Sequence, residues 1–227
     1  MTTPFGNVEE GLAFLRQHDV KDLVFCGRVQ RPKLRDLSVD RLGAKWLMRI
    51  TPHFFRDDGL LRAVTKEFES EGFNLLSVED VLSSQDMMTE GNLTSFGPTA
   101  ENIEDIKRGF AVLNALGNQD VGQSIIVQKG IVLGIEAVEG TNALIDRVQS
   151  YVDPQLFEAV LVKAAKKAQT RQADLPVVGP DTVDHGVRVG LKGMALEAGS
   201  VILIDRESLI RKAEKEGFFI VDMRGET

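Results

Sequence analysis

The sequence predicts an α/β fold divided into two domains, on the basis of three observations. Short apolar runs rich in β-branched residues alternate with stretches of helical periodicity. The chain has 227 residues, 43% of them hydrophobic, which is enough for one large core or two modest ones. The composition between Ser83 and Pro98 turns to Ser, Gly, Asn, Thr and Met, which is typical of an interdomain connection. We therefore expect an N-terminal α/β domain over residues 1–97 and a C-terminal α/β domain over residues 98–227.

The first half is expected to begin with a helix over Val8–Gln17 and a short buried strand over Asp22–Cys26. Cys26 is the single cysteine, so an internal disulfide is excluded, and its place after an apolar run predicts a small core residue. Asp57 or Asp58 would cap a helix that follows, with a ligand role as the alternative. The other expected elements are a helix over Leu42–Ile50, a helix over Leu60–Glu71, a strand over Asn74–Leu76 and a short helix opened by a capping box at Ser77–Asp80.

In the second half, Thr99 is the expected N-cap of a helix that continues to about Leu116. The runs Ser124–Val127 and Ile131–Ala137, joined by Lys129-Gly130, predict a hairpin. Leu156–Ala168 has the character of a helix. The remaining expected elements are helices over Asn142–Ser150, over Asp181–Leu191 and from the cap Asp205 to Glu216, and strands over Met194–Glu197, Val201–Ile204 and Phe218–Asp222.

The charge balance argues against several classes of partner. Acidic residues outnumber basic ones, 34 to 27, for a net charge of -7, which argues against nucleic acid as a partner and against simple adhesion to an anionic membrane.

The longest apolar runs are far shorter than a bilayer span, and Met1–Asn7 lacks a signal-peptide pattern, so we expect a cytoplasmic protein. The spacing of His18, His53 and His185 does not favour a histidine-built metal centre.

One candidate site is the stretch Gln169–Pro180, which holds Asp174 between a polar run containing Arg171 and a short apolar run. This pattern is typical of a loop that leads into a buried strand. A carboxylate fixed at such a junction could supply the protein's ligand to Mg²⁺, which prefers hard oxygen donors and completes its shell with phosphate and water. The alternative is that Asp174 only caps the loop by accepting backbone N–H bonds.

A second candidate site is the turn from Glu136 to Thr141. Glu136 and Glu139 flank a sharp turn, and Thr141 could cap the helix that follows, whose free N–H groups would suit a diphosphate. The alternative is an ordinary strand-turn-helix junction. Lys163, Lys166 and Lys167 share one face of the helix predicted over Leu156–Ala168, where they would either face phosphates or stay hydrated.

Three motifs carry a resemblance to a known family. They are Asp-Leu-Pro-x-x-Gly-Pro at 174–180 after a Gln-x-Arg run, Gly-Ile-Glu-Ala-Val-Glu-Gly-Thr at 134–141, and Cys-Gly-Arg-Val-Gln-Arg-Pro at 26–32. Together they resemble the UDP-2,3-diacylglucosamine pyrophosphatases of lipid A synthesis in Gram-negative bacteria, of the magnesium-dependent type unrelated to metallophosphoesterases. The similarity extends from about Val24 to about Met223.

The resemblance implies two α/β domains that enclose an acylated UDP-sugar in a cleft, Mg²⁺ as cofactor, and hydrolysis of the diphosphate to UMP and 2,3-diacylglucosamine 1-phosphate. Asp174 matches the essential carboxylate, which would bind Mg²⁺ or activate the attacking water. A homodimer is expected at family level, and peripheral contact with the inner membrane stays open. The residues that match substrate-binding positions are Gln123, Glu136, Glu139, Gly140, Thr141, Lys166, Gln169 and Arg171.

The sequence also departs from the family pattern. Lys167, Thr170 and Asn142 stand where the family has Pro, an acidic residue and Asp. The family's opening strand and Gly-Gly-Gly-x-Leu-Pro turn have no counterpart before Val8. This last departure leaves an alternative to the hydrolase, which is a non-catalytic binder of the nucleotide or the acylated sugar.

Overall fold

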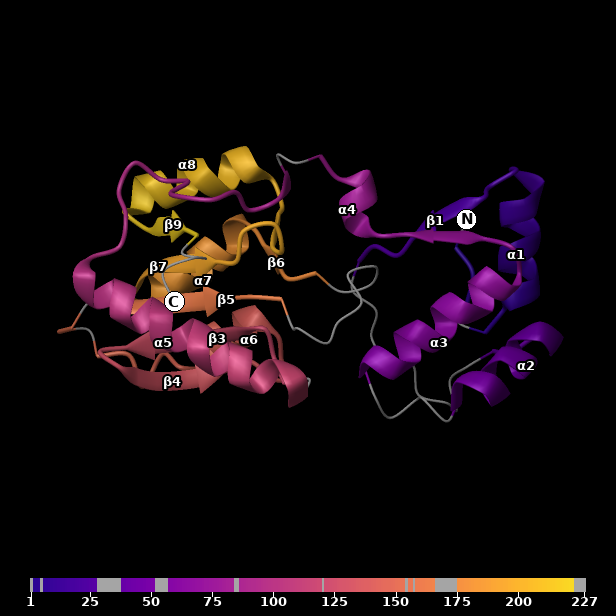
Figure 1. The fold of residues 1–227 in the computed structure, drawn as a ribbon, viewed down its shortest axis with the longest axis horizontal. Coiled ribbons are helices and arrows are strands. Elements are labelled where there is room, and N and C mark those ends of the chain that lie inside the picture. The colour runs from indigo at the N-terminus through magenta and orange to yellow at the C-terminus, as the bar shows by residue number, and fades with distance from the viewer. Residues whose placement is uncertain are drawn as a thin grey trace. The chain divides into compact units, whose positions relative to one another are not determined.

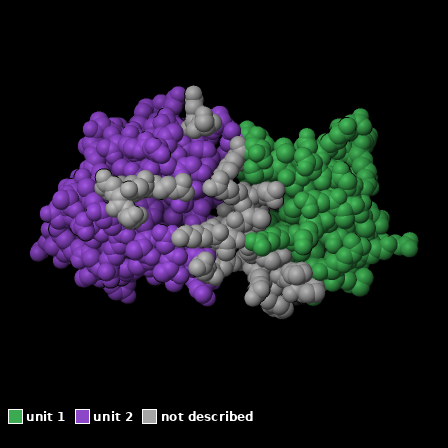
Figure 2. All heavy atoms as spheres, viewed as in Figure 1, with its two compact units in different colours: residues 1–81, 170–174 green, residues 82–169, 175–227 purple. Residues whose placement is uncertain are grey.

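The computed structural model describes residues 2–4, 6–27, 38–51, 57–83, 86–119, 121–153, 155–156, 158–165 and 175–222. The chain divides into two units, one containing residues 1–81 and the other residues 82–169 and 175–227 (Figure 2). Each unit has its own hydrophobic core and mixes helices with strands, which confirms the predicted α/β class. The cleft between two domains stays a prediction.

The first unit is built on two parallel strands, β1 (Asp22–Val24) and β2 (Asn74–Leu76), in which Leu23 pairs with Leu75 (Figure 1). Its helices are α1 (Val8–Gln17), α2 (Arg41–Ile50), α3 (Asp57–Ser70) and α4 (Val78–Val81). The buried core residues are Leu12, Trp46, Ile50, Phe73 and Leu75. The ring of Trp46 meets that of Phe68 edge-on at 5.0 Å between centroids, so aromatic packing unites α2 with α3.

Two predictions for this unit differ from the structure. Strand β1 ends at Val24, and Cys26 is exposed, so the prediction of a buried core cysteine is wrong. A strand in a two-stranded sheet has only one hydrogen-bonded neighbour, and β1 alternates between exposed and partly buried residues instead of lying inside a core. Helix α3 begins at Asp57, which places both aspartates in its first turn rather than before it.

The second unit contains a five-stranded sheet in the order β4-β3-β5-β7-β9. In this sheet β3 runs antiparallel to both of its neighbours, β4 and β5, so the other four described strands point the same way. A separate parallel pair joins β6 to β8. The strand bounds are β3 Ser124–Gln128, β4 Ile131–Ile135, β5 Ala159–Lys163, β6 Val177–Val178, β7 Leu191–Leu196, β8 Ile202–Leu203 and β9 Phe219–Val221.

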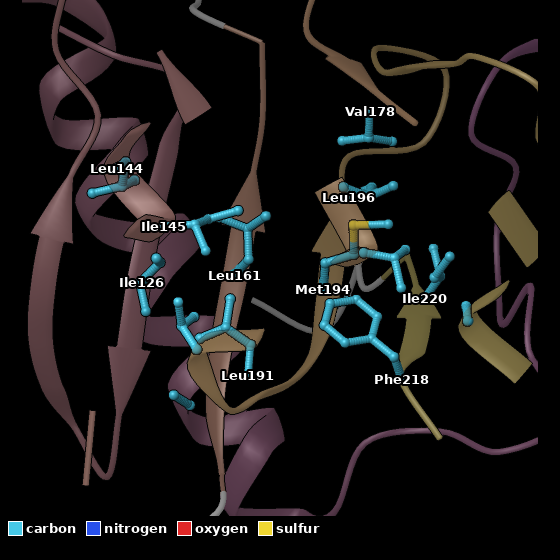
Figure 3. Packing of buried hydrophobic residues seen from close by; sticks show 14 of the residues in the cluster. Ile126, Leu144, Ile145, Leu161, Val178, Leu191, Met194, Leu196, Phe218 and Ile220 are labelled. Carbon is cyan, nitrogen blue, oxygen red and sulfur yellow. The ribbon is translucent and has the colours of Figure 1, made fainter. Parts of the chain in front are cut away.

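Helices cover both faces of this sheet (Figure 1). Helix α5 (Ala100–Leu116) lies on one face against β3 and β5. The other face packs against α6 (Thr141–Arg147), α7 (Pro180–Val189) and α8 (Arg206–Glu216). Because side chains alternate along a strand, successive residues of β5 enter opposite cores: Leu161 belongs to one cluster, and Val160 and Val162 belong to the other. Figure 3 shows the first of these cores, with Leu161 between Ile126 and Met194.

The β3–β4 hairpin contains a β-bulge. Ile126 pairs with Gly134, but the next residue, Val127, pairs with Val132, so Leu133 has no partner opposite it. An extra residue of this kind bends a strand and changes the side on which later side chains emerge. Beyond the bulge, the Glu136 N–H donates to the Ser124 carbonyl at 2.8 Å, which places Glu136 opposite the start of β3.

The prediction of a helix over Leu156–Ala168 is wrong for the described residues of that range. Residues Ala159–Lys163 form β5, the central strand of the sheet, and every one of them is buried. A strand covered by helices on both faces is apolar throughout and lacks the alternation that distinguishes strands from helices in sequence. Lys163 therefore closes a strand and does not share a helical face with the two later lysines, which lie outside the described residues.

The connection predicted over Ser83–Pro98 belongs to the second unit. Met88 is 1% exposed, and its N–H donates to the Val201 carbonyl at 2.8 Å. Further along, the Leu93 N–H donates to the Ile220 carbonyl at 2.9 Å. The units accordingly separate between Val81 and Leu82, whereas the composition shift places the boundary at residues 97–98. Polar and small residues are typical of linkers. Here, however, the backbone of this segment forms hydrogen bonds and isolated bridges with the chain at β8 and β9.

Several local predictions are confirmed. Thr99 caps α5 in a capping box with Asn102, and Ser77 forms the same motif with Asp80. The hairpin occurs as predicted, and Asp205 caps α8 by accepting the Ser208 N–H. Among the described residues, we find no helix with the length and apolar character needed to span a membrane.

Candidate functional site

Several polar side chains of the second unit lie at one edge of the five-stranded sheet. Strands β4, β5, β7 and β9 all end at this edge, and the antiparallel strand β3 begins there. In open α/β sheets, ligands bind beyond the carboxyl ends of the parallel strands. We call this region the carboxyl edge. Its polar residues are Gln123, Ser124, Glu136, Lys163, Glu197 and Asp222.

A cluster of side chains at this edge is centred on Thr141, the first residue of α6. The Thr141 Oγ1 donates to Glu136 Oε1 at 3.3 Å and lies 3.2 Å from the Ser124 hydroxyl. The Lys163 Nζ donates to the same Thr141 oxygen at 2.5 Å. The other carboxylate oxygen of Glu136 accepts the Gln123 N–H at 3.4 Å. The structure therefore brings together three predicted site residues, Gln123, Glu136 and Thr141.

Two glycines allow the backbone to adopt this arrangement, one by permitting a close approach of two segments and the other by adopting a positive φ. A Cβ on Gly122 would lie 1.9 Å from the carbonyl oxygen of Glu136, so only glycine lets the start of β3 pass this close to Glu136. Gly140 has φ of +85°, a conformation that side-chain-bearing residues rarely adopt, and it turns the chain into α6. These glycines fix where Glu136 and Thr141 sit relative to each other.

Thr141 does not cap its helix, so that part of the prediction is wrong. The N-cap of α6 is Gly140, which makes no side-chain cap bond. The Thr141 hydroxyl is occupied by Glu136, Ser124 and Lys163, which come from other elements. A capping hydroxyl bonds to its own backbone two or three residues ahead. Here the tertiary partners take precedence over that local bond.

Glu139 lies in the same turn but has different partners. One oxygen accepts the Arg147 guanidinium at 2.8 Å, and the other accepts the Ala137 N–H at 3.2 Å. A hydrogen bond from its own backbone N–H and the pairing with Arg147 hold the pKa of this carboxyl below its usual value. Arg147 also donates to the Ile135 carbonyl, so the ion pair ties the end of β4 to the end of α6. A role for Glu139 in substrate binding stays a prediction.

Two further carboxylates follow the ends of β7 and β9. Glu197 accepts the Ala165 N–H at 2.9 Å, and its own N–H donates to the Lys163 carbonyl at 3.0 Å. Asp222 is 8% exposed and accepts the Ala198 N–H at 3.0 Å. These bonds hold the chain as it leaves the central strands, and they keep acidic oxygens along the carboxyl edge.

Sequence reasoning missed the environment of Lys163. Lys163 is only 4% exposed at the carboxyl end of the central strand, whereas its sequence pattern predicts a position on a helix surface. The signal that could have identified it is a single charged residue directly after the apolar run Ala159–Val162, which is where a doubly covered strand reaches its functional edge.

The remaining predicted site residues, Lys166, Gln169, Arg171 and Asp174, lie outside the described residues. Within the described part of the chain, we find no cluster of three or more His, Cys, Asp or Glu that could hold a metal ion. The donors at the carboxyl edge are nevertheless carboxylate and hydroxyl oxygens, which suit a hard cation such as Mg²⁺. Asp174 remains the predicted metal ligand.

Comparisons with known proteins identify the family. The model of the LpxI C-terminal domain matches residues 89–221, and the model of the LpxI N-terminal domain matches residues 1–85. UDP-2,3-diacylglucosamine pyrophosphatase LpxI of Caulobacter vibrioides is 35% identical over 213 residues, covering 91% of this chain and 76% of that protein. These matches confirm the resemblance inferred from the motifs. The chain belongs to the LpxI family.

Proposed function

We propose that this protein hydrolyses the diphosphate of UDP-2,3-diacylglucosamine to UMP and 2,3-diacylglucosamine 1-phosphate in lipid A synthesis. The observation that carries the proposal is the 35% identity, over 91% of the chain, to a pyrophosphatase named for this substrate. The polar cluster at the carboxyl edge supports it, because that edge is where α/β sheets bind nucleotides and other phosphorylated ligands.

The substrate needs partners for its phosphates and for its sugar and base groups. We assign the phosphate contacts to Lys166 and Arg171, whose cations match the charge of a diphosphate. The other binding residues supply acceptors and amide or hydroxyl donors. We assign this role to Gln123, Glu136, Glu139, Gly140, Thr141 and Gln169.

The cofactor in this proposal is Mg²⁺, with Asp174 as the residue that would hold it. When bound, the cation would neutralise charge that develops on the phosphoryl oxygens during attack by water. A carboxylate such as Asp174 supplies a hard oxygen ligand and can also orient that water.

The proposal is tested by assaying purified protein for release of UMP from UDP-2,3-diacylglucosamine with and without Mg²⁺. Turnover should require Mg²⁺, stop on addition of EDTA, and fall at least about 100-fold in Asp174→Asn, since loss of one catalytic electrostatic group costs this much. The matched control is Asp181→Asn, an exposed carboxylate in the first turn of α7, which should leave turnover unchanged.

Three results would contradict parts of this assignment. Normal turnover by Asp174→Asn would remove the residue from the site, and full activity in EDTA would remove the metal. Calorimetric binding of the substrate by the wild-type chain without any release of UMP would show a non-catalytic binder instead of a hydrolase.

We also propose a cytoplasmic location with peripheral contact to the inner membrane, because the substrate carries acyl chains that favour a lipid phase. Cosedimentation with phospholipid vesicles tests this contact, and absence of protein from the pellet would contradict it. A homodimer, proposed at family level, is tested by light scattering of the purified chain.

A further inference from the structure

Lys163 is a buried cation in contact with the site cluster. The residue is 4% exposed, at the end of the central strand β5, and its Nζ lies 2.5 Å from Thr141 Oγ1. Lysine is rarely this buried, because removing an ammonium group from water is costly. Replacing a buried charged group by an apolar residue of similar volume is often neutral or stabilising, and the four preceding residues of β5 are apolar. The burial therefore points to a role in the site.

The contacts of the Thr141 hydroxyl determine the direction of its proton. A hydroxyl offers one donor and two acceptor lone pairs. The ammonium of Lys163 can only donate, and Glu136 as a carboxylate can only accept. The proton of Thr141 is consequently directed to Glu136, and the remaining lone pair accepts the proton of Ser124. Lys163 thus orders a chain of hydrogen bonds that ends on Glu136.

The carboxylate of Glu136 is fixed from two sides. Thr141 donates to one of its oxygens, and the Gln123 N–H donates to the other. A carboxylate has about four acceptor sites, so these two bonds leave capacity for a donor from a bound ligand. Without the Lys163 side chain, Thr141 could turn its proton elsewhere and one of the two bonds that fix Glu136 would be lost.

We propose that Lys163 is a positioning residue for substrate binding, acting through the Thr141 hydroxyl to hold Glu136 in one orientation as an acceptor for a hydroxyl or N–H group of the substrate. The inference rests on the proposed function, since Glu136 is assigned there to substrate binding. It differs from a direct phosphate contact by Lys163, which would make the lysine part of the binding surface itself.

The test compares Lys163→Met, Thr141→Val and the double variant for hydrolysis of UDP-2,3-diacylglucosamine. Each single variant should raise KM about tenfold and change kcat less than threefold, because ground-state binding is lost. The double variant should be no worse than the poorer single variant, since two residues that act through one contact are not additive. The matched control is Lys192→Met, an exposed lysine near the start of β7, which should match wild type.

Additivity is the outcome that overturns the inference. If the double variant raises KM by the product of the single effects, about 100-fold, Lys163 acts independently of Thr141. A KM for Lys163→Met equal to that of Lys192→Met would overturn it as well. Should Lys163→Met fail to fold by circular dichroism, Thr141→Val and Thr141→Ser decide, because only the serine retains the hydroxyl and should restore KM.

Failure of the proposed function is distinguished by the wild-type protein. If wild type releases no UMP, the hydrolase proposal fails, and the same variants are then compared by calorimetric Kd for the substrate. A tenfold weaker Kd for Lys163→Met than for Lys192→Met would keep the positioning role in a binding protein. Absence of both turnover and binding in wild type would overturn the inference too.

Discussion

The two edges of the five-stranded sheet both carry buried polar residues, but they use them differently. At the carboxyl edge, Lys163, Thr141, Glu136 and Ser124 bond side chain to side chain. At the opposite edge, where β3 turns into β4, the buried Asp105 bonds to backbone N–H groups. Hydrogen bonds between two side chains are a small minority of the hydrogen bonds in folded proteins. Their concentration at the carboxyl edge therefore distinguishes this edge from the opposite one.

The opposite edge shows what polar residues with a structural role look like. Asp105 is 2% exposed and accepts the Lys129 and Gly130 N–H groups at 2.7 and 2.6 Å. Gln128 exchanges two 3.0 Å bonds with the backbone of Asp153. Asn102 donates to the Glu158 carbonyl at 3.2 Å. Each of these side chains satisfies backbone groups of a turn or strand end, which stabilises the fold and leaves little to offer a ligand.

The comparison teaches how to separate structural from functional polar groups in this sheet. Buried residues that satisfy backbone groups should affect stability when replaced, whereas the side chains bonded to one another around Thr141 should affect binding. The following predictions test that distinction, in order of decreasing effect.

The largest effect on stability is expected for Asp105→Ala. Loss of two charge-assisted hydrogen bonds to the hairpin turn should lower the free energy of unfolding by about 2–4 kcal/mol, with KM of the folded enzyme changed less than threefold. Urea unfolding and substrate kinetics measure the two quantities. The neighbouring exposed Glu104, replaced by Ala, should cost less than about 0.5 kcal/mol.

An effect of Asp105→Ala on KM as large as its effect on stability would break the distinction between the edges. A stability loss no greater than that of Glu104→Ala would show instead that water replaces the carboxylate at the turn.

A smaller loss of stability, combined with a loss of binding, is expected for Gly122→Ala. The new Cβ would lie 1.9 Å from the Glu136 carbonyl oxygen, so Glu136 must move. We expect KM to rise about tenfold and stability to fall by about 1–3 kcal/mol, as for other overpacked sites. Steady-state kinetics and urea unfolding provide the measurements.

The matched glycine control is Gly11→Ala in the interior of α1, where the nearest side-chain atom is 4.0 Å away. It should raise stability by up to about 1 kcal/mol and leave KM unchanged. An unchanged KM in Gly122→Ala would mean that the position of Glu136 does not matter for binding.

The smallest effect is expected for Glu139→Gln, and it should depend on pH. Because the folded protein holds the pKa of Glu139 below its usual 4.5, the ionised group stabilises the fold above that pH, and this contribution is lost as pH falls through the folded pKa. The variant should be less stable than wild type by under about 1 kcal/mol at pH 7, since the pair is partly exposed.

Urea unfolding at pH 7 and at acidic pH checks the prediction for Glu139. The difference between wild type and variant should shrink well below pH 4.5. A difference that stays constant with pH would show that the ion pair with Arg147 contributes no stability.

The sequence predicts those elements whose signals are local. Thr99, Ser77 and Asp205 are caps that act within one helical turn, and the Lys129-Gly130 turn defines its hairpin. The central strand Ala159–Lys163 could not be recognised in this way, because its covering helices come from distant parts of the chain. The exposure of Cys26 likewise depends on a non-local property, which is how many strands pair beside β1.

The candidate site shows the same limit. The turn from Glu136 to Thr141 can be recognised as a sequence motif. Its residues Glu136 and Thr141 meet each other and Gln123 in the structure, and all three are predicted site residues. Lys163 lies 22 positions beyond Thr141, and its contact depends on the register between β3 and β5, in which Ser124 pairs with Lys163. No short pattern encodes a contact of this kind. The proposed metal ligand Asp174 stays a prediction from the family motif.

The bulge at Leu133 decides which way Glu136 faces. If Leu133 instead paired with Ile126, the register set at the turn would continue, and Ile135 instead of Glu136 would lie opposite Ser124. Glu136 would then emerge toward α5, away from Thr141, while most of the hairpin pairing survived. Whether Leu133 is left out of the pairing thus decides on which side of the sheet the carboxylate of Glu136 lies.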